Sequence, residues 1–380
     1  MKNITASIIL QTLTALTGIL NVPLLIMASS LDIFSQYVFM LSISSIISLI
    51  TSGLSLNLSS SKECRRNTAL NFYFCIIVSL TLMFFVTQVL NIKWKILFVM
   101  IFTIITIEAA KGVSISIQKF QRFQVILLLL KLVTTLFLFI LAQNPNSEII
   151  TAYQLALVMM FPATILFTII LKTEYNNLKH LYLPFDYIND TKSLTAARIL
   201  TGSQEHIVKL AIITYFTSEA VAVFEFINRL CKQSKSIIDN ALSFLIRSFE
   251  NEQDFNLRWL IAFQLSTITL FSILTFTFVR FIYSYLNYEA NLLQEAVIVL
   301  IFSGYMALLA NTIFLHYSAA KNNFRFMVKV SSIRFIYTIG IVTLVHLSFL
   351  GFQSFVIMFS LGLIVVGGAN FCKLTRILKI

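Results

Sequence analysis

The sequence predicts an all-α polytopic membrane protein with about twelve transmembrane helices in two six-helix bundles. Composition, the recurrence of long apolar runs and the placement of basic residues indicate this class. Hydrophobic residues make up 58% of the 380 residues, charged residues only 12%, and the mean hydropathy is +0.87. A soluble domain carries about 25% charged residues because polar side chains must cover its surface. Much of this chain therefore has to face lipid.

Apolar runs of about 20 residues recur along the chain, and each is long enough to cross a bilayer as a helix that satisfies its own backbone hydrogen bonds. The twelve predicted spans cover residues 4–27, 33–58, 68–90, 94–117, 123–142, 149–171, 194–217, 221–247, 256–283, 293–316, 326–346 and 351–372. The longest polar interval, 172–193, separates an N-terminal lobe (1–171) from a C-terminal lobe (194–380). We predict that it is a cytoplasmic linker, either an ordinary loop or a short interfacial helix.

Basic residues concentrate in alternate connections between the predicted spans. One side of the membrane collects most of them, whereas the opposite side holds only Lys93, Lys95 and Arg280. Because Lys and Arg accumulate in cytoplasmic connections, both termini are predicted to be cytoplasmic. The net charge of +12 is therefore mainly a topology signal, and it is no argument for binding nucleic acid.

The sequence offers no catalytic or metal-binding pattern. It has no nucleotide-binding P-loop, and its four cysteines are scattered without metal-ligand spacing. No arrangement of Ser, His and Asp and no pair of carboxylates suggests a reaction. We therefore expect a protein that is not an enzyme and that holds no metal or cofactor.

Two parts of the chain resemble each other. Residues 30–39 align with 217–226, with an acid on an acid and an aromatic on an aromatic twice. Further along, Arg122-Phe123 aligns with Arg325-Phe326, and Lys131 then falls on Arg334. These matches predict a duplication in which two six-helix repeats are related by an axis along the membrane normal.

Charged residues inside the predicted spans are the main functional candidates, because each costs at least a few kcal/mol without a partner or an aqueous cavity. The basic ones are Lys111, Lys131, Arg198, Lys209, Arg229, Lys232, Lys235 and Arg334, and the acidic ones are Glu108, Glu205, Glu225 and Asp239. Most lie on spans 194–217 and 221–247, where helical periodicity places them along one face. Local ion pairs that fix helix packing are one interpretation, and a cationic cavity for an anionic substrate is the other. The spacing allows three such pairs, Glu205–Lys209 and Glu225–Arg229 at i, i+4 and Glu108–Lys111 at i, i+3.

The repeat extends the second interpretation to the other half of the chain. When the alignment of residues 30–39 with 217–226 is continued, Arg229, Lys232 and Lys235 correspond to Ser42, Ser45 and Ser48. One half would then carry a cationic wall and the other a hydroxyl wall suited to sugar-like groups.

The stretches Pro23 to Phe39 and Ile207 to Phe249, together with twelve short-looped helices and cytoplasmic ends, are similar to those of bacterial O-antigen flippases. These are lipid-linked oligosaccharide translocases in the polysaccharide-export branch of the multidrug/oligosaccharidyl-lipid/polysaccharide exporter superfamily. The chain departs from that family where Ser35-Gln36 precede Tyr37 in place of its usual glycine, and it is somewhat short. The resemblance implies two MATE-like lobes related by a pseudo-twofold axis.

The resemblance also implies a function. The chain would flip undecaprenyl-pyrophosphate-linked oligosaccharide units across the bacterial inner membrane by alternating access, for O-antigen or capsular polysaccharide, with H⁺ or Na⁺ as coupling ion. Its partners would be that substrate, membrane lipid and other polysaccharide-assembly membrane proteins. Arg198, Lys209, Arg229, Lys232 and Lys235 would contact phosphate or acidic sugar, with Lys111, Lys131 and Arg334 as second choices. Glu108, Glu205, Glu225 and Asp239 would organise the site or couple the ion.

Other functions stay open. A multidrug or cation antiporter of the same fold should have an acid-dominated cavity in the first half, where only Glu108 lies inside a span. An integral-membrane polysaccharide polymerase should have a large outward loop, and the predicted outward loops are short. A membrane scaffold or channel is a further alternative.

Overall fold

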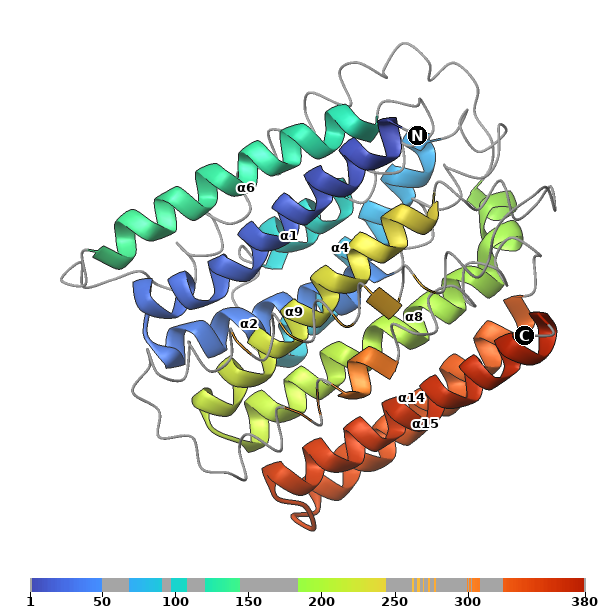
Figure 1. Ribbon diagram of the computed structural model, residues 1–380. Coiled ribbons are helices and arrows are strands. Elements are labelled where there is room, and N and C mark those ends of the chain that lie inside the picture. Colours follow the sequence, from blue (N-terminus) through green and yellow to red (C-terminus); the bar gives the residue numbers. More distant parts are fainter. Residues whose placement is uncertain are drawn as a thin grey trace. The chain divides into compact units, whose positions relative to one another are not determined.

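The computed structural model describes residues 2–49, 68–90, 97–107, 120–143, 184–243, 303–307 and 324–378, with isolated helical positions between 262 and 301. Within these ranges every regular element is helical, as the all-α prediction requires. The bounded helices are α1 (Lys2–Ala28), α2 (Leu31–Ser48), α4 (Thr68–Leu90), α6 (Phe120–Gln143), α8 (Pro184–Tyr215), α9 (Ser218–Ser243), α14 (Phe324–His346) and α15 (Phe352–Leu378) (Figure 1).

Five of the described helices are long and apolar enough to cross a membrane. These segments are Ile9–Ala28, Leu31–Ser48, Gln121–Gln143, Val328–His346 and Phe352–Asn370. Each overlaps a span predicted from the sequence, and α4 has the same bounds as the predicted span 68–90. The predicted span 149–171 lies outside the described residues. The charged helices α8 and α9 are not among the five.

Helix α8 starts ten residues before the predicted span 194–217, within the interval predicted as a linker. Pro184 is its first residue, a position where the missing N–H has no partner in any helix and the fixed φ suits the first turn. Residues 184–193 are therefore the first turns of a long helix.

The chain divides into two compact units, which we describe separately. Unit 1 comprises Met1–Pro23 and Thr214–Ile380, and unit 2 comprises Leu24–Ile213. This division follows compactness alone, so the lobes at 1–171 and 194–380 stay a prediction.

Unit 2 is built around α2. This helix packs against α4 and buries Phe34, Tyr37 and Val38 almost completely. Near its C-terminal end, Leu49 lies against Gly202 of α8, so closely that a Cβ at this glycine would overlap the leucine side chain. The glycine thus leaves room for the Leu49 side chain against α8.

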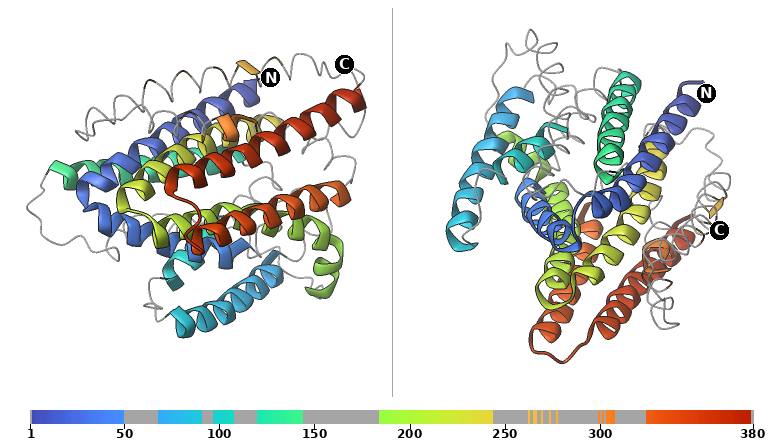
Figure 2. Two further views of the ribbon diagram at one scale, coloured as in Figure 1. Left: turned by 90° about the horizontal axis from the view of Figure 1, so that it is seen from below. Right: turned by 90° about the vertical axis from the view of Figure 1, so that its left-hand side faces the viewer.

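Unit 1 contains a helical hairpin formed by α14 and α15, which contact each other (Figure 1) and diverge from their connecting turn in Figure 2. The hydroxyl of Tyr337 on α14 donates a hydrogen bond to the carbonyl of Met358 on α15, with an O···O distance of 2.6 Å. Helix α15 also contacts the segment 303–307. Gly367 lies against the backbone of Ala307, and a Cβ added to Gly367 would come within 2.7 Å of the Ala307 carbonyl oxygen. Small residues at such contacts let transmembrane helices pack closely.

The two segments aligned as a repeat begin their helices in the same way. Ser30 precedes α2, and its hydroxyl accepts a hydrogen bond from the backbone N–H of Ile33. Thr217 precedes α9, and its hydroxyl accepts one from the backbone N–H of Ala220. Such hydroxyls satisfy donors that a helix N-terminus leaves without partners. The two aligned segments therefore share a capping pattern, and the duplication itself stays a prediction.

Helix α6 shows what a lipid-facing surface looks like in this chain. Its exposed large side chains are Val125, Leu129, Leu132, Val133, Leu136, Phe137, Phe139 and Ile140. A soluble protein rarely exposes a contiguous apolar face of this size. The exposure of α6 agrees with a membrane environment.

Candidate functional site

Helix α8 carries a buried ion pair in unit 2. The Lys209 ammonium lies 3.0 Å from the Glu205 carboxylate, and their side chains are 5% and 15% exposed, respectively. The residues are four apart, so they lie on neighbouring turns of one helical face. Gln204 and His206, next to Glu205 in sequence, are also buried. This helix therefore holds several polar groups away from lipid.

Helix α9 carries a second buried pair, in unit 1. The Nε of Arg229 donates a hydrogen bond to Oε1 of Glu225 at 2.8 Å, and the side chains are 16% and 2% exposed, respectively. From Val221 to Cys231 every side chain is buried except Val223 and Arg229, which are half-buried. The arginine is thus the more accessible charge on an otherwise enclosed stretch of helix.

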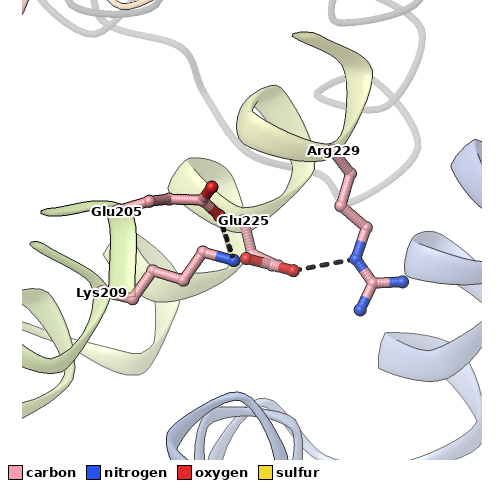
Figure 3. A network of polar contacts seen from close by, with 4 residues as sticks. All are labelled: Glu205, Lys209, Glu225 and Arg229. Carbon is pink, nitrogen blue, oxygen red and sulfur yellow. Dashed lines mark hydrogen bonds and ion pairs between the residues drawn. The ribbon is translucent and has the colours of Figure 1, made fainter. Parts of the chain in front are cut away.

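Figure 3 draws both pairs as sticks, with the contact within each pair as a dashed line. In each pair an acid precedes a base by four residues, which is the more favourable order along a helix. Each buried charge has a neutralising neighbour, as burial in a low dielectric requires. Both local pairings that the spacing predicted are therefore formed, and the roles assigned to these residues in substrate binding or coupling stay predictions.

Three other predicted basic residues have described side chains. Lys232 is exposed on α9, one turn beyond Arg229, whereas Lys131 on α6 and Arg334 on α14 are half-buried. Lys232 and Arg334 belong to unit 1, and Lys131 belongs to unit 2. The α9 residues Arg229 and Lys232 are the two predicted contacts that one described helix face brings near each other.

The remaining predicted residues divide into two groups. Arg198 lies on α8, and Lys235 and Asp239 lie on α9, but their side chains are outside the described part of the structure. Glu108 and Lys111 lie outside the described residues altogether, and so does the pairing that their spacing allows.

The serines predicted as a hydroxyl wall lie on α2. Ser42 and Ser48 are buried, and Ser45 is half-buried. Ser48 donates a hydrogen bond to the carbonyl of Ser45, with an O···O distance of 3.0 Å. These hydroxyls enrich the buried part of unit 2 in polar groups, and their role as a substrate-facing wall stays a prediction.

Sequence reasoning missed two buried amides. Gln204 precedes Glu205 on α8 and Asn228 precedes Arg229 on α9, and both amides are fully buried. The sequence feature that could have identified them is an uncharged polar residue next to a charged one within a predicted membrane-spanning helix. Within the described residues, no group of three or more His, Cys, Asp or Glu side chains is placed to hold a metal ion.

Comparison with known proteins gives structural matches only. No family model and no curated protein matches the chain. The MATE multidrug transporter DinF-BH, solved as a complex, is 12% identical and has a TM-score of 0.64, over 98% of this chain and 94% of its own. A MATE structure in complex with MaL6 is 13% identical with a TM-score of 0.54, over 97% of this chain and 94% of its own.

These matches show that the chain has the fold of MATE transporters. The predicted class, an all-α polytopic membrane protein with about twelve transmembrane helices in two six-helix bundles, is thereby confirmed. The chain is a multi-pass membrane protein with a transporter fold.

Proposed function

We propose that this chain is a membrane transporter that works by alternating access, and that it acts as a multidrug or cation antiporter. The observation that carries this proposal is the structural likeness, which extends over nearly the whole chain. Three of the solved structures it resembles are described as complexes, two of them with MaL6 or Br-NRF. A transporter of organic solutes accounts for this fold without invoking a reaction.

The buried charges support a transport role. Ionisable residues within membrane-spanning helices are costly and usually mark substrate or ion pathways. Glu225 is buried on α9 beside Arg229, whereas Glu205 on α8 is half-buried beside Lys209. Glu225 is our candidate for the carboxylate that couples transport to a H⁺ or Na⁺ gradient, in an inner membrane with both termini cytoplasmic.

Inside-out vesicles from cells that express the chain test this function directly. We expect energised vesicles to accumulate ethidium, a fluorescent lipophilic cation, faster than vesicles from cells without the chain. Glu225→Gln should abolish the difference, because it removes the buried charge on α9. Arg122→Ala, which alters an exposed residue of α6, is the matched control and should keep it. Equal accumulation with and without the wild-type chain would contradict the antiporter.

A second candidate is the translocation of lipid-linked oligosaccharides that the sequence resemblance implies. The specific observation in its favour is the accessibility of basic groups on α9, where Arg229 is the more exposed member of its pair and Lys232 is exposed. The planar guanidinium group of arginine and the ammonium group of lysine are the usual protein partners of phosphate. The substrate would then be a polyprenyl-pyrophosphate-linked glycan, with membrane lipid and other polysaccharide-assembly proteins as partners.

Proteoliposomes that contain a pyrophosphate-linked disaccharide lipid separate the two candidates. Membrane-impermeant periodate initially oxidises only the outer-leaflet glycan, and a flippase should make the inner-leaflet glycan reactive as well. We expect the paired substitution Arg229→Ala and Lys232→Ala to abolish that second phase when the signal is expressed per molecule of inserted protein. Wild-type oxidation kinetics in the double variant would exclude the role of these cations. Ethidium transport without glycan translocation would favour the antiporter.

A further inference from the structure

Two turns of unit 1 meet through aromatic residues. The first is Phe216-Thr217, which links α8 to α9, and the second is Leu347–Gly351, which links α14 to α15. The Tyr215 hydroxyl and His346 Nδ1 are hydrogen-bonded at 2.8 Å, although 131 residues separate them in sequence. Their rings also contact edge to face, with centroids 5.8 Å apart.

A second contact connects the same two turns. The ring of Phe216 lies 5.2 Å from that of Phe352 and 5.8 Å from that of Phe355, centroid to centroid. Aromatic pairs at such distances stabilise beyond the area they bury. The α8–α9 turn is thus attached to the start of α15 as well as to the end of α14.

The α14–α15 turn is held in a defined conformation. The backbone N–H of Phe349 bonds to the carbonyl of Leu344, and that of Ser348 bonds to the carbonyl of Val345. This pair of bonds is a Schellman motif, in which one residue takes the left-handed conformation. Ser348 occupies that position with φ of 60°, where glycine is usual. The backbone hydrogen bonds of this turn therefore fix the end of α14, where His346 lies.

These contacts lie directly before the helix that carries the accessible arginine. Thr217 caps α9, since its carbonyl accepts a bond from the N–H of Val221 and its hydroxyl accepts one from that of Ala220. Arg229 is eleven residues after Ser218, or about 16 Å along the helix axis. An α-helix moves largely as a rigid rod. A contact that fixes the first turn of α9 therefore limits how far Arg229 can shift along the helix axis or rotate about it.

We propose that Tyr215 and His346 form a clasp that positions α9, and with it Arg229, during transport. The clasp joins the α8–α9 turn to the α14–α15 hairpin so that these helix ends move together. Tyr215 and His346 are positioning residues in this proposal, because they act through α9 and lie about three helical turns from Arg229. The inference rests on the proposed transport function.

A double-mutant cycle tests the clasp. Tyr215→Phe removes only the hydroxyl, and His346→Phe removes the ring nitrogens. We expect each to lower the maximum transport rate by about two- to tenfold, the range that one lost hydrogen bond allows, with the half-saturating concentration unchanged. The double variant should be no slower than the slower single variant. His346→Asn, which keeps a polar atom near the position of Nδ1, should restore most of the rate.

The wild type, the two single Phe variants and the double variant distinguish failure of the clasp from failure of the transport function. Their thermal unfolding midpoints in detergent require no substrate, and the double shift should be smaller than the sum of the single shifts. Independent shifts would overturn the clasp even if no substrate is transported. Coupled shifts with unchanged turnover would overturn the positioning role. If the shifts of the variants are coupled but the wild-type chain moves neither ethidium nor glycan, the contact is established and the transport function is refuted. The positioning role is then overturned with it.

Discussion

The ion pairs of α8 and α9 share one sequence pattern and differ in which charge is hidden. On α8 the base is the more buried member, because Lys209 is 5% exposed and Glu205 is 15% exposed. On α9 the acid is the more buried member, because Glu225 is 2% exposed and Arg229 is 16% exposed. An acid four residues before a base therefore has two different outcomes in one chain.

The difference assigns the pairs different roles. A buried ammonium with a more accessible carboxylate is a packing element, since the cation has little access to any substrate. A buried carboxylate with a more accessible guanidinium holds the arginine in place through Nε and directs the opposite end of the group away from the acid. We therefore expect α8 to stabilise the protein and α9 to contact the substrate.

The largest expected effect comes from Arg229→Met. The change leaves the nearly inaccessible Glu225 carboxylate without its base, which should lower the free energy of unfolding by about 3–5 kcal/mol. Transport should also be lost in the fraction of protein that remains folded. Thermal unfolding in detergent and vesicle transport measure the two effects, with Arg122→Met on the exposed part of α6 as control. An unchanged unfolding midpoint would contradict the importance of the pair.

Glu205→Gln should have a smaller effect on stability and little effect on transport. The amide still offers an oxygen to Lys209, so the cost should be about 1–3 kcal/mol, as for one buried polar group left poorly paired. Transport per inserted molecule should match the wild type. The matched control is Glu219→Gln, an exposed acid of α9. A loss of transport larger than the loss of inserted protein would place α8 in the substrate pathway.

Exchanging the two charges within each pair separates packing from recognition. Glu205→Lys with Lys209→Glu, and Glu225→Arg with Arg229→Glu, both preserve an ion pair, and the longer side chain at each acid position should cost about 1–3 kcal/mol in stability. We expect the α8 exchange to keep transport within about threefold and the α9 exchange to reduce it at least about tenfold, equivalent to about 1.4 kcal/mol. Equal losses in both would remove the distinction between the pairs.

The smallest effects should come from exchanging the type of base. Lys209→Arg enlarges a buried side chain and should cost about 1 kcal/mol in stability without changing transport. Arg229→Lys keeps the charge and loses the planar fork, so phosphate-linked glycan should be moved about threefold more slowly. Ethidium transport would be unaffected by that second change. Identical behaviour of the two substitutions would show that only net charge matters.

Several features of the structure follow from local sequence. The run 68–90 is a helix with the predicted bounds because its residues are uninterrupted and apolar. The pairs on α8 and α9 were predictable from spacing, since residues four apart are neighbours on any helix. The cap hydroxyls of Ser30 and Thr217 also act locally, within three residues of their own position.

Other features depend on packing between segments far apart in the chain. Helix α8 begins at Pro184, ten residues before the predicted span, because hydropathy alone does not detect helical turns made of polar residues. The closeness of Gly367 to Ala307 depends on where a second helix lies. No spacing rule connects Tyr215 to His346, which are 131 residues apart.

The sequence by itself determined the membrane environment and the all-α class, and it gave the pairing of Glu205 with Lys209 and of Glu225 with Arg229 as one of two interpretations. Each of these follows from interactions within about one helical turn or from the length of an apolar run, and both are written along the chain. Only the tertiary structure decided which charge of each pair is buried and which turns meet through Tyr215 and His346. Burial is set by neighbours that other helices supply, so the same local pattern can hide an acid or a base.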